Sequence, residues 1–174
     1  METVLKTRLE RFLDLEALRC EKDVSRVLYI ERKFDDIISL PSGDLHMTCR
    51  VDRVDEMTDG GIMVIDYKTG SVDPMPADIS GVDESMLSRE FIRDRVRSFQ
   101  LPLYVYYLQR HFPGRAINSF LYHLRTMSID KFFKDGRGQD IDQLMTAYLK
   151  ALDLIIAEIY NPEIPFTDDP VDIK

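Results

Sequence analysis

Three charged residues near an apolar stretch are the strongest candidates for chemistry in this chain of 174 residues. Residues 61–70 read GIMVIDYKTG, so that four apolar residues lead directly into Asp66 and Lys68. A strand as apolar as residues 62–65 is expected to lie buried between two layers. Burying charge at its end is costly unless another group compensates it. Asp66 and Lys68 therefore either emerge into water or are placed for chemistry.

A second carboxylate, that of Asp52, is predicted to face Asp66. The sequence TDGG at residues 58–61 is typical of a tight hairpin turn, because Asp-Gly supplies positive φ angles. A turn centred on Asp59 sets Asp52 opposite Asp66, with Cβ atoms about 4.5–5.5 Å apart, and a two-residue turn shifts the pairing by one position. Lys68 follows Asp66 by two residues and projects from the same strand face. Two carboxylates and one ammonium group should converge on one patch.

This patch suits phosphodiester hydrolysis. Paired carboxylates repel each other unless a cation lies between them, and a hard divalent cation such as Mg²⁺ takes oxygen ligands. The lysine could orient a nucleophilic water or stabilise charge that develops on a phosphate. An alternative stays open at this point: acidic residues near a hairpin end are commonly solvated, and an Asp-Lys pair two residues apart often forms a weak surface ion pair.

Hydrophobic periodicity and turn residues predict an α/β fold, a mixed central β-sheet flanked by helices in the order α-β-β-β-α-β-β-α. We expect a single domain with an N-terminal helix over 1–20, a core over 26–134 that contains the candidate residues, a C-terminal helix over 139–160 and an irregular tail over 161–174. The finer pattern predicts strands over 26–38, 45–57, 62–68, 116–126 and 129–133, a loop over 71–84, and a helical pattern over 85–111 in which Pro102 should form a kink or a junction.

Composition narrows the function further. A formal net charge of −8 argues against a protein that coats nucleic acid by bulk electrostatics, although a local basic groove stays compatible with it. The three histidines lack metal-ligand spacing, and the two cysteines, Cys20 and Cys49, are expected to be reduced thiols. The sequence contains no apolar run long enough for a membrane span. We therefore expect a cytoplasmic protein that is not membrane-bound.

Two segments together resemble a known family. CRVDRVDEMTDGGIMVIDYKTG, at residues 49–70, and FQLPLYVYY, at residues 99–107, resemble the RecB/AddB-type nuclease domain of the PD-(D/E)XK superfamily and are similar to CRISPR-associated exonucleases. The resemblance covers roughly residues 27–124 and implies a restriction-endonuclease-like core. It implies that Asp52 and Asp66 ligate Mg²⁺ or Mn²⁺, that the Tyr67 backbone carbonyl is a further ligand, and that Lys68 is the catalytic lysine.

The same resemblance implies that Gln100 and Tyr104 contact the DNA backbone, and their i, i+4 spacing puts both on one helix face. Core packing is an alternative role for Tyr104, which lies in the apolar sequence LYVYYL. Glu31 matches a frequent family glutamate and could assist the metal site, with a structural or surface role as the alternative. Arg53 is expected to point to the opposite face of the sheet.

A basic stripe could supply further DNA contacts. Arg89, Arg93 and Arg97 recur at i, i+4 and i+8 and could follow phosphates despite the acidic total. A solvated helix face, on which these arginines pair with Glu90 and Asp94, is an equally open reading.

The resemblance also has departures. Many members carry a metal-binding histidine upstream of the first strand, and no histidine precedes His46 here. Related nucleases often hold an iron–sulfur cluster beyond the last helix, and no such cysteines occur, so we expect no iron–sulfur cluster within this chain. The chain is interpreted as a fragment of a longer helicase-nuclease.

The resulting hypothesis is a DNA exonuclease domain that depends on Mg²⁺ or Mn²⁺. It would act on single-stranded DNA or duplex ends in repair or recombination, with a helicase domain or subunit as partner. Two alternatives stay open: a catalytically inactive DNA-binding or scaffold module, and an RNA-directed or structure-specific endonuclease on the same core.

Overall fold

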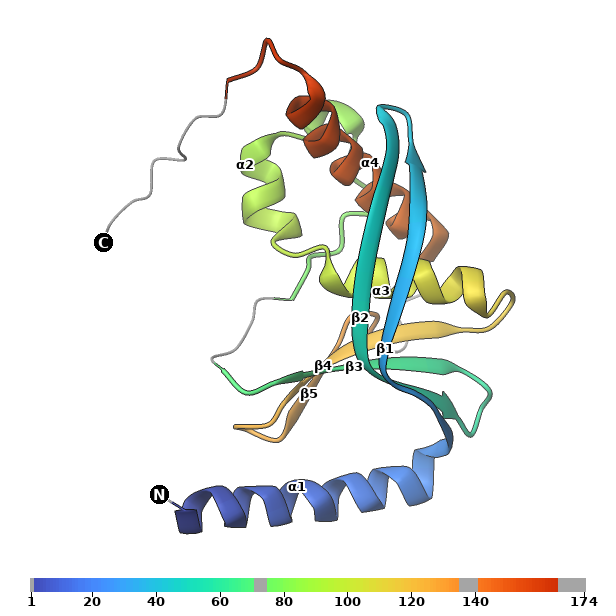
Figure 1. Cartoon of the computed structure of the whole chain (residues 1–174), viewed down its shortest axis with the longest axis vertical. Coiled ribbons are helices and arrows are strands. Elements are labelled where there is room, and N and C mark those ends of the chain that lie inside the picture. The colour runs from blue at the N-terminus through green and yellow to red at the C-terminus, as the bar shows by residue number, and fades with distance from the viewer. Residues whose placement is uncertain (1, 71–74, 135–140, 166–174) are drawn as a thin grey trace.

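The computed structural model describes residues 2–70, 75–134 and 141–165, and its elements follow the predicted order (Figure 1). Their bounds are α1 (Glu2–Asp23), β1 (Val24–Leu40), β2 (Gly43–Met57), β3 (Ile62–Lys68), η1 (Glu84–Met86), α2 (Arg89–Phe91), η2 (Ile92–Val96), α3 (Gln100–His111), β4 (Ile117–His123), β5 (Ser128–Lys131) and α4 (Ile141–Tyr160). A mixed sheet flanked by helices confirms the predicted α/β class. Residues 71–74 of the predicted loop, the predicted helix start at 139–140 and most of the predicted tail lie outside the described residues.

The sheet has the strand order β1-β2-β3-β4-β5, with β3 and β4 parallel and the other neighbours antiparallel. The apolar run of the sequence therefore forms the central strand, and Ile62, Val64 and Ile65 are almost fully buried. Because side chains alternate along a strand, Ile62 and Val64 join the large core beneath α3 and α4, whereas Ile65 packs on the other face with α1. Asp66 and Lys68, at the end of β3, follow the same alternation and lie on the face of Ile62 and Val64.

Strands β1 and β2 run well past β3 as a long two-stranded ribbon that crosses α3 and α4 (Figure 1). Both strands are longer than the predicted 26–38 and 45–57, because their pairing continues to the turn between Leu40 and Gly43. Buried Phe34 and Ile38 anchor the ribbon to the core, and the Tyr107 hydroxyl donates to the Met47 carbonyl at 3.0 Å. The ribbon thus fixes α3 against the end of the sheet.

The helical pattern over 85–111 is broken, but not at Pro102, where the sequence predicted a kink or junction. A π-helical turn, η2, ends at Val96, and the φ of 61° at the next residue, Arg97, interrupts the helix before α3 begins at Gln100. Pro102 lies in the first turn of α3, where backbone N–H groups lack intrahelical acceptors in any case. The prediction of a junction was correct, and its placement at Pro102 was wrong.

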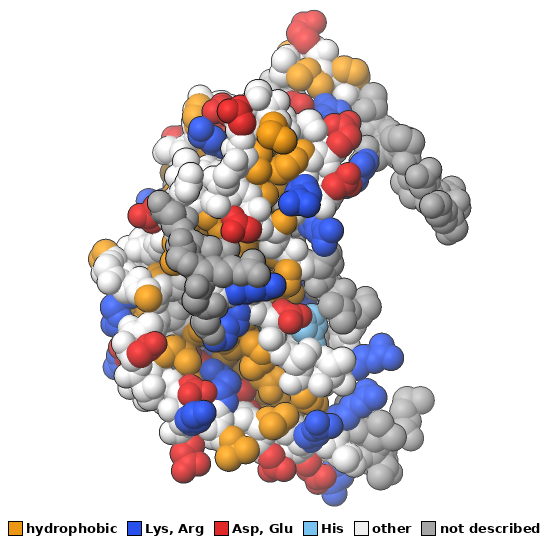
Figure 2. Space-filling view, turned by 180° about the vertical axis from the view of Figure 1, so that it is seen from behind, with side chains coloured by type: hydrophobic (Ala, Val, Ile, Leu, Met, Phe, Trp, Pro, Cys, Tyr) orange, Lys and Arg blue, Asp and Glu red, His pale blue; other side chains and the backbone are white. Residues whose placement is uncertain are grey.

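Helix α1 crosses the sheet face opposite α3 and α4 and makes only a small apolar contact with it. Phe12 packs edge-on against Tyr67 and Tyr122, with ring centroids 5.9 and 5.4 Å apart. The helix leaves large apolar side chains exposed along its flanks, namely Leu9, Leu13, Leu15 and Leu18. In the view from behind, acidic and basic side chains are interspersed over the surface (Figure 2). Among the described residues, no helix combines the length and apolar character that crossing a membrane requires.

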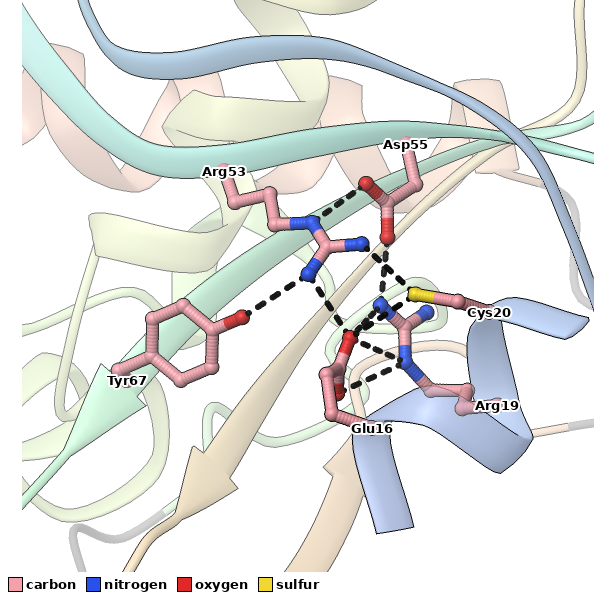
Figure 3. A network of polar contacts seen from close by, with 6 residues as sticks. All are labelled: Glu16, Arg19, Cys20, Arg53, Asp55 and Tyr67. Carbon is pink, nitrogen blue, oxygen red and sulfur yellow. Dashed lines mark hydrogen bonds and ion pairs between the residues drawn. The ribbon is translucent and has the colours of Figure 1, made fainter. Parts of the chain in front are cut away.

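An ionic network provides the main attachment of α1 to the sheet (Figure 3). Arg19 Nη2 lies 2.6 Å from both Glu16 Oε1 and Asp55 Oδ2. Arg53, on β2, places Nε 2.7 Å from Asp55 Oδ1 and Nη1 2.8 Å from Glu16 Oε1. Asp55 is completely buried, so its charge depends on both guanidinium groups. Arg53 therefore points away from the face of Asp66, as the sequence predicted.

We predict that Asp55→Ala lowers the free energy of unfolding by about 3–5 kcal/mol, because it leaves buried guanidinium groups without their carboxylate. Urea denaturation followed by circular dichroism measures the change. Glu10→Ala is the control, because Lys6 and Glu10 form an exposed ion pair at 3.9 Å, and such pairs contribute at most about 1 kcal/mol. Equal midpoints for the two variants would show that the network does not stabilise the fold.

Candidate active site

The hairpin between β2 and β3 places Asp52 beside Asp66. Arg53 pairs with Ile65 in the β2–β3 ladder, which is the register that a turn centred on Asp59 predicted. Continuing this register by one position sets Asp52 opposite Asp66, and the Tyr67 backbone N–H donates to Asp52 Oδ2 at 2.8 Å. The predicted cross-strand arrangement of the two carboxylates is therefore confirmed.

Lys68 and Gln100 complete a closed set of contacts around Asp66. Lys68 Nζ lies 2.9 Å from Asp66 Oδ2, which confirms that the two side chains share a strand face. Gln100 Nε2 donates to Asp66 Oδ1 at 2.6 Å, and Lys68 Nζ donates to Gln100 Oε1 at 3.0 Å. Gln100 is the first residue of α3, so the start of this helix is joined to the end of β3.

Tyr104 lies one helical turn further along α3 and supports Gln100. Gln100 Nε2 lies 2.8 Å from the Tyr104 hydroxyl, which donates to the Arg50 carbonyl at 3.0 Å. The same hydroxyl is 3.4 Å from Asp66 Oδ1. Burial raises the pKa of Tyr104, so the phenol stays neutral and keeps its proton for donation. Tyr104 is both packed in the core and in contact with the polar cluster.

The Asp66 carboxylate is held in an unfavourable environment. Its side chain is nearly inaccessible, with the residue only 4% exposed, and this burial raises the pKa of Asp66 above its ordinary value. The Lys68 ammonium opposes the increase, and the negative charge of Asp52 adds to it. The Lys68 ammonium, 2.9 Å from buried Asp66 Oδ2, compensates one of the two carboxylate charges. A divalent cation between Asp52 and Asp66 would offset the cost of burying charge and the repulsion between the carboxylates.

The donor set fits a hard divalent cation. Asp52 and Asp66 supply carboxylate oxygens from adjacent strands, and the Tyr67 backbone between Asp66 and Lys68 supplies a carbonyl. Within the described ranges, no group of three or more His, Cys, Asp or Glu side chains is arranged so that it could hold a metal ion. A metal held here would therefore rely on two carboxylates, a backbone carbonyl and water, which is a pattern that Mg²⁺ accepts.

A cleft of about 240 Å³ opens beside the cluster. Lys68 and Gln100 form part of its wall, together with Arg97 and Ser98 from the segment before α3. A larger hollow of about 550 Å³ lies near the other end of β3, by Ile62, and contains none of these groups. Of these two hollows, the smaller cleft is the one that reaches Lys68 and Gln100, the two groups in contact with Asp66.

Other predicted site residues are not drawn into the cluster. The Glu31 carboxylate pairs with Arg50 Nε at 2.8 Å and lies on the exposed side of the ribbon. Arg93 Nε pairs with Asp94 Oδ1 at 2.8 Å, and Arg89 Nε pairs with Glu158 at 2.6 Å. Because η2 is π-helical, the three arginines do not form the regular α-helical stripe that their spacing predicted. Among them, Arg97 alone lines the cleft.

Sequence reasoning missed the groups that surround the predicted residues. The Arg50 carbonyl, which holds Tyr104, carries no side-chain signal. Asp55 did carry a side-chain signal, because it follows Arg53 by two residues along β2, and this spacing predicts a shared face of the strand. The i, i+3 spacing of Glu16 and Arg19 likewise predicts a shared face of α1. Contacts between these two pairs could not be predicted without knowing that α1 crosses the sheet face that carries Arg53 and Asp55.

Comparison with known proteins identifies the family of the chain. The family model described as "PD-(D/E)XK nuclease superfamily" matches residues 1–170, and the chain therefore belongs to this superfamily. Membership indicates nuclease chemistry on phosphodiester bonds, for which divalent metals are typical. No curated protein matches the chain. A solved structure described as "Crystal structure of SSO0001" is similar, with 14% identity and a TM-score of 0.37. The alignment covers 87% of this chain and 58% of that one.

We predict that Asp66→Asn raises the free energy of unfolding at neutral pH when EDTA is present. A carboxyl whose pKa is raised by folding stabilises the fold below its unfolded-state pKa and loses that contribution as pH rises through the folded-state pKa. The neutral amide avoids this loss, so the difference should shrink in acid. Asp14→Asn, an exposed change on α1, is the control. An Asp66→Asn protein that is less stable than wild type at pH 7 would contradict the prediction.

Proposed function

We propose that this member of the PD-(D/E)XK superfamily is a divalent-metal-dependent DNA exonuclease domain of the RecB/AddB type. The observation that carries the proposal is the closed set of contacts in which Asp66 is joined to both Lys68 and Gln100 while Asp52 lies across the hairpin. A merely structural role would not require two carboxylates to lie beside a single ammonium group at a buried strand end.

Asp52, Asp66 and the Tyr67 carbonyl would hold Mg²⁺ or Mn²⁺. The bound metal would supply Lewis acidity toward the phosphate and a water of lowered pKa. Asp52 is fixed by the Tyr67 N–H, and Asp66 is fixed by Gln100, so both ligands are oriented by short hydrogen bonds. Such preorganisation keeps the carboxylates in place without a further conformational change.

Lys68 would stabilise the charge that develops on the phosphate. Its ammonium group is 2.9 Å from Asp66 Oδ2 and is steadied by Gln100 Oε1. A cation at the carboxylates would compete for Asp66, which would let Lys68 turn toward a phosphate in the adjoining cleft. Fixed positive charge beside a reacting phosphate is a strong source of transition-state stabilisation.

Gln100 and Tyr104 would contact the DNA backbone from the start of α3. Gln100 bonds Asp66, Lys68 and Tyr104 in the DNA-free protein, so its amide can exchange one of these bonds for a phosphate oxygen. Arg97, at the cleft, and Arg93, on η2, are proposed as further contacts. The proposed substrates are single-stranded DNA and duplex ends.

The biological setting of the proposal is DNA repair or recombination, in which a helicase domain or subunit would deliver DNA ends to this site. It rests on the two segments 49–70 and 99–107, because these carry the resemblance to the RecB/AddB type. Structure-specific or RNA-directed cleavage is the alternative among nucleases.

A catalytically inactive DNA-binding module is the second candidate. One observation favours it: among the described residues, no third acidic or histidine side chain joins Asp52 and Asp66. The first histidine of the sequence, His46, points elsewhere and bonds Asp35. An inactive module would retain DNA binding without metal-dependent cleavage.

We predict that Mn²⁺ raises the melting temperature of the wild-type protein. A ligand that binds only the native state stabilises it by about 2.7 kcal/mol at a hundred times its dissociation constant. Asp52→Asn should abolish the shift, because it removes one of the two carboxylate ligands, and Asp142→Asn, on α4, should retain it. A shift of equal size in Asp52→Asn would rule out this metal site.

We predict that the wild-type protein shortens end-labelled linear DNA with Mg²⁺ or Mn²⁺ and leaves closed circular DNA intact. Asp66→Ala should abolish this activity, and Lys68→Ala should lower the turnover number by about 10²–10³-fold, as for loss of one transition-state donor. Lys150→Ala, which removes an exposed ammonium group on α4, is the control.

Gel analysis of single-stranded and duplex substrates distinguishes the candidates. Equal cleavage by the wild type and both site variants would contradict the proposed active site. Cutting of closed circles would favour an endonuclease, and retained binding without any cleavage would favour the inactive module.

A further inference from the structure

The segment that joins η2 to α3 contains a strained residue beside the cleft. Arg97 has φ 61° and ψ −45°, a conformation that L-residues with a side chain rarely adopt. Its backbone N–H donates to the Ile92 carbonyl at 2.9 Å, and the next N–H, of Ser98, donates to the Val96 carbonyl at 2.6 Å. Such a conformation costs on the order of 1–3 kcal/mol, and glycine would adopt it at little cost. The presence of arginine rather than glycine at this position therefore needs an explanation.

Arg97, at the strained turn, lines the cleft that Lys68 also lines. Arg97 Nε donates to the Asp94 carbonyl at 2.9 Å, which orients the guanidinium group while the residue stays exposed. Gln100 and Ser98 add an amide and a hydroxyl, and Leu121 contributes apolar wall. One cation thus comes from the central strand and a second from the turn before α3.

The chemistry of this cleft favours an anion. Among the described residues that line it, two are cationic and none is acidic, although the whole chain carries a net charge of −8. Its volume of about 240 Å³ equals that of about eight waters at roughly 30 Å³ each, which is room for one phosphodiester unit with some hydration. Arginine suits such a group, because its planar fork can donate two hydrogen bonds to a phosphate.

We propose that Arg97 and Lys68 bracket a single backbone phosphate of the DNA strand, next to the bond that is cut, and that the strained turn at Arg97 exists to hold this phosphate. The inference rests on the proposed nuclease function and deepens it, because it assigns the position of the strand relative to the carboxylates. Arg97 acts as a positioning residue: it sets the register of the strand and takes no part in proton transfer.

The test is Arg97→Gly, which separates strain from function. Glycine accepts the positive φ, so the free energy of unfolding should be unchanged or higher, whereas an arginine with a purely structural role would be destabilising to remove. Affinity for a labelled single-stranded oligonucleotide, measured by fluorescence anisotropy, should fall about tenfold, as for loss of a hydrogen bond to a charged group. The Asp66→Asn background prevents cutting during the measurement.

Salt dependence identifies the lost contact as a phosphate contact. For single-stranded DNA, the slope of log K against log salt concentration should become shallower by about 0.7 in Arg97→Gly. Arg97→Lys should retain most of the slope. Arg95→Ala removes the same charge from an exposed side chain outside the cleft and should leave the slope unchanged.

Two results would overturn the inference: equal slopes for Arg97→Gly and wild type, or equal losses in Arg97→Gly and Arg95→Ala. Failure of the exonuclease proposal is separate. A wild-type protein that cuts no DNA, but whose salt slope still depends on Arg97, would refute the exonuclease activity and support the phosphate site.

Discussion

Burial of the Asp66 carboxylate at the end of the central strand is the constraint on which the rest of the structure depends. The strand that carries it is apolar and lies between two layers, so the carboxylate is almost completely shielded from bulk water. Lys68 and Gln100 satisfy part of its charge, and the β2–β3 register brings a second carboxylate, that of Asp52, to the same place. Two carboxylates near one ammonium group leave an uncompensated negative charge, which a bound cation would neutralise.

The two faces of the sheet contribute differently to this arrangement. On one face, α3 starts beside the end of β3, so that Gln100 and Tyr104 reach Asp66 directly. On the other face, the network of Glu16, Arg19, Arg53 and Asp55 attaches α1, and Arg53 Nη1 approaches the Tyr67 hydroxyl at 3.5 Å (Figure 3). Tyr67 lies between Asp66 and Lys68 in the chain, so the ionic network and the Phe12 contact restrain the strand end from behind.

The sequence predicted the parts of this structure that depend on local patterns. Alternation along residues 62–68 and the Asp-Gly turn were enough to bring Asp52, Asp66 and Lys68 together, because strand geometry leaves few alternatives. Residue spacing alone could not decide between a solvated ion pair and a metal site. The position of the break at Arg97 was not predictable either, because arginine gives no local signal for a positive φ, whereas Pro102 gave a misleading one. The ionic network required the packing of α1, which no local pattern specifies.

Anomalous diffraction from a crystal soaked in Mn²⁺ would locate a metal at these residues directly. We expect an anomalous peak bounded by the carboxylates of Asp52 and Asp66 and the Tyr67 carbonyl, at roughly 2.0–2.2 Å from each ligand oxygen. Lys68 Nζ should move away from Asp66 Oδ2 when the metal is bound. Well-ordered crystals with Mn²⁺ elsewhere but none at this position, and with the Lys68–Asp66 contact unchanged, would contradict the assignment of these residues as a metal centre.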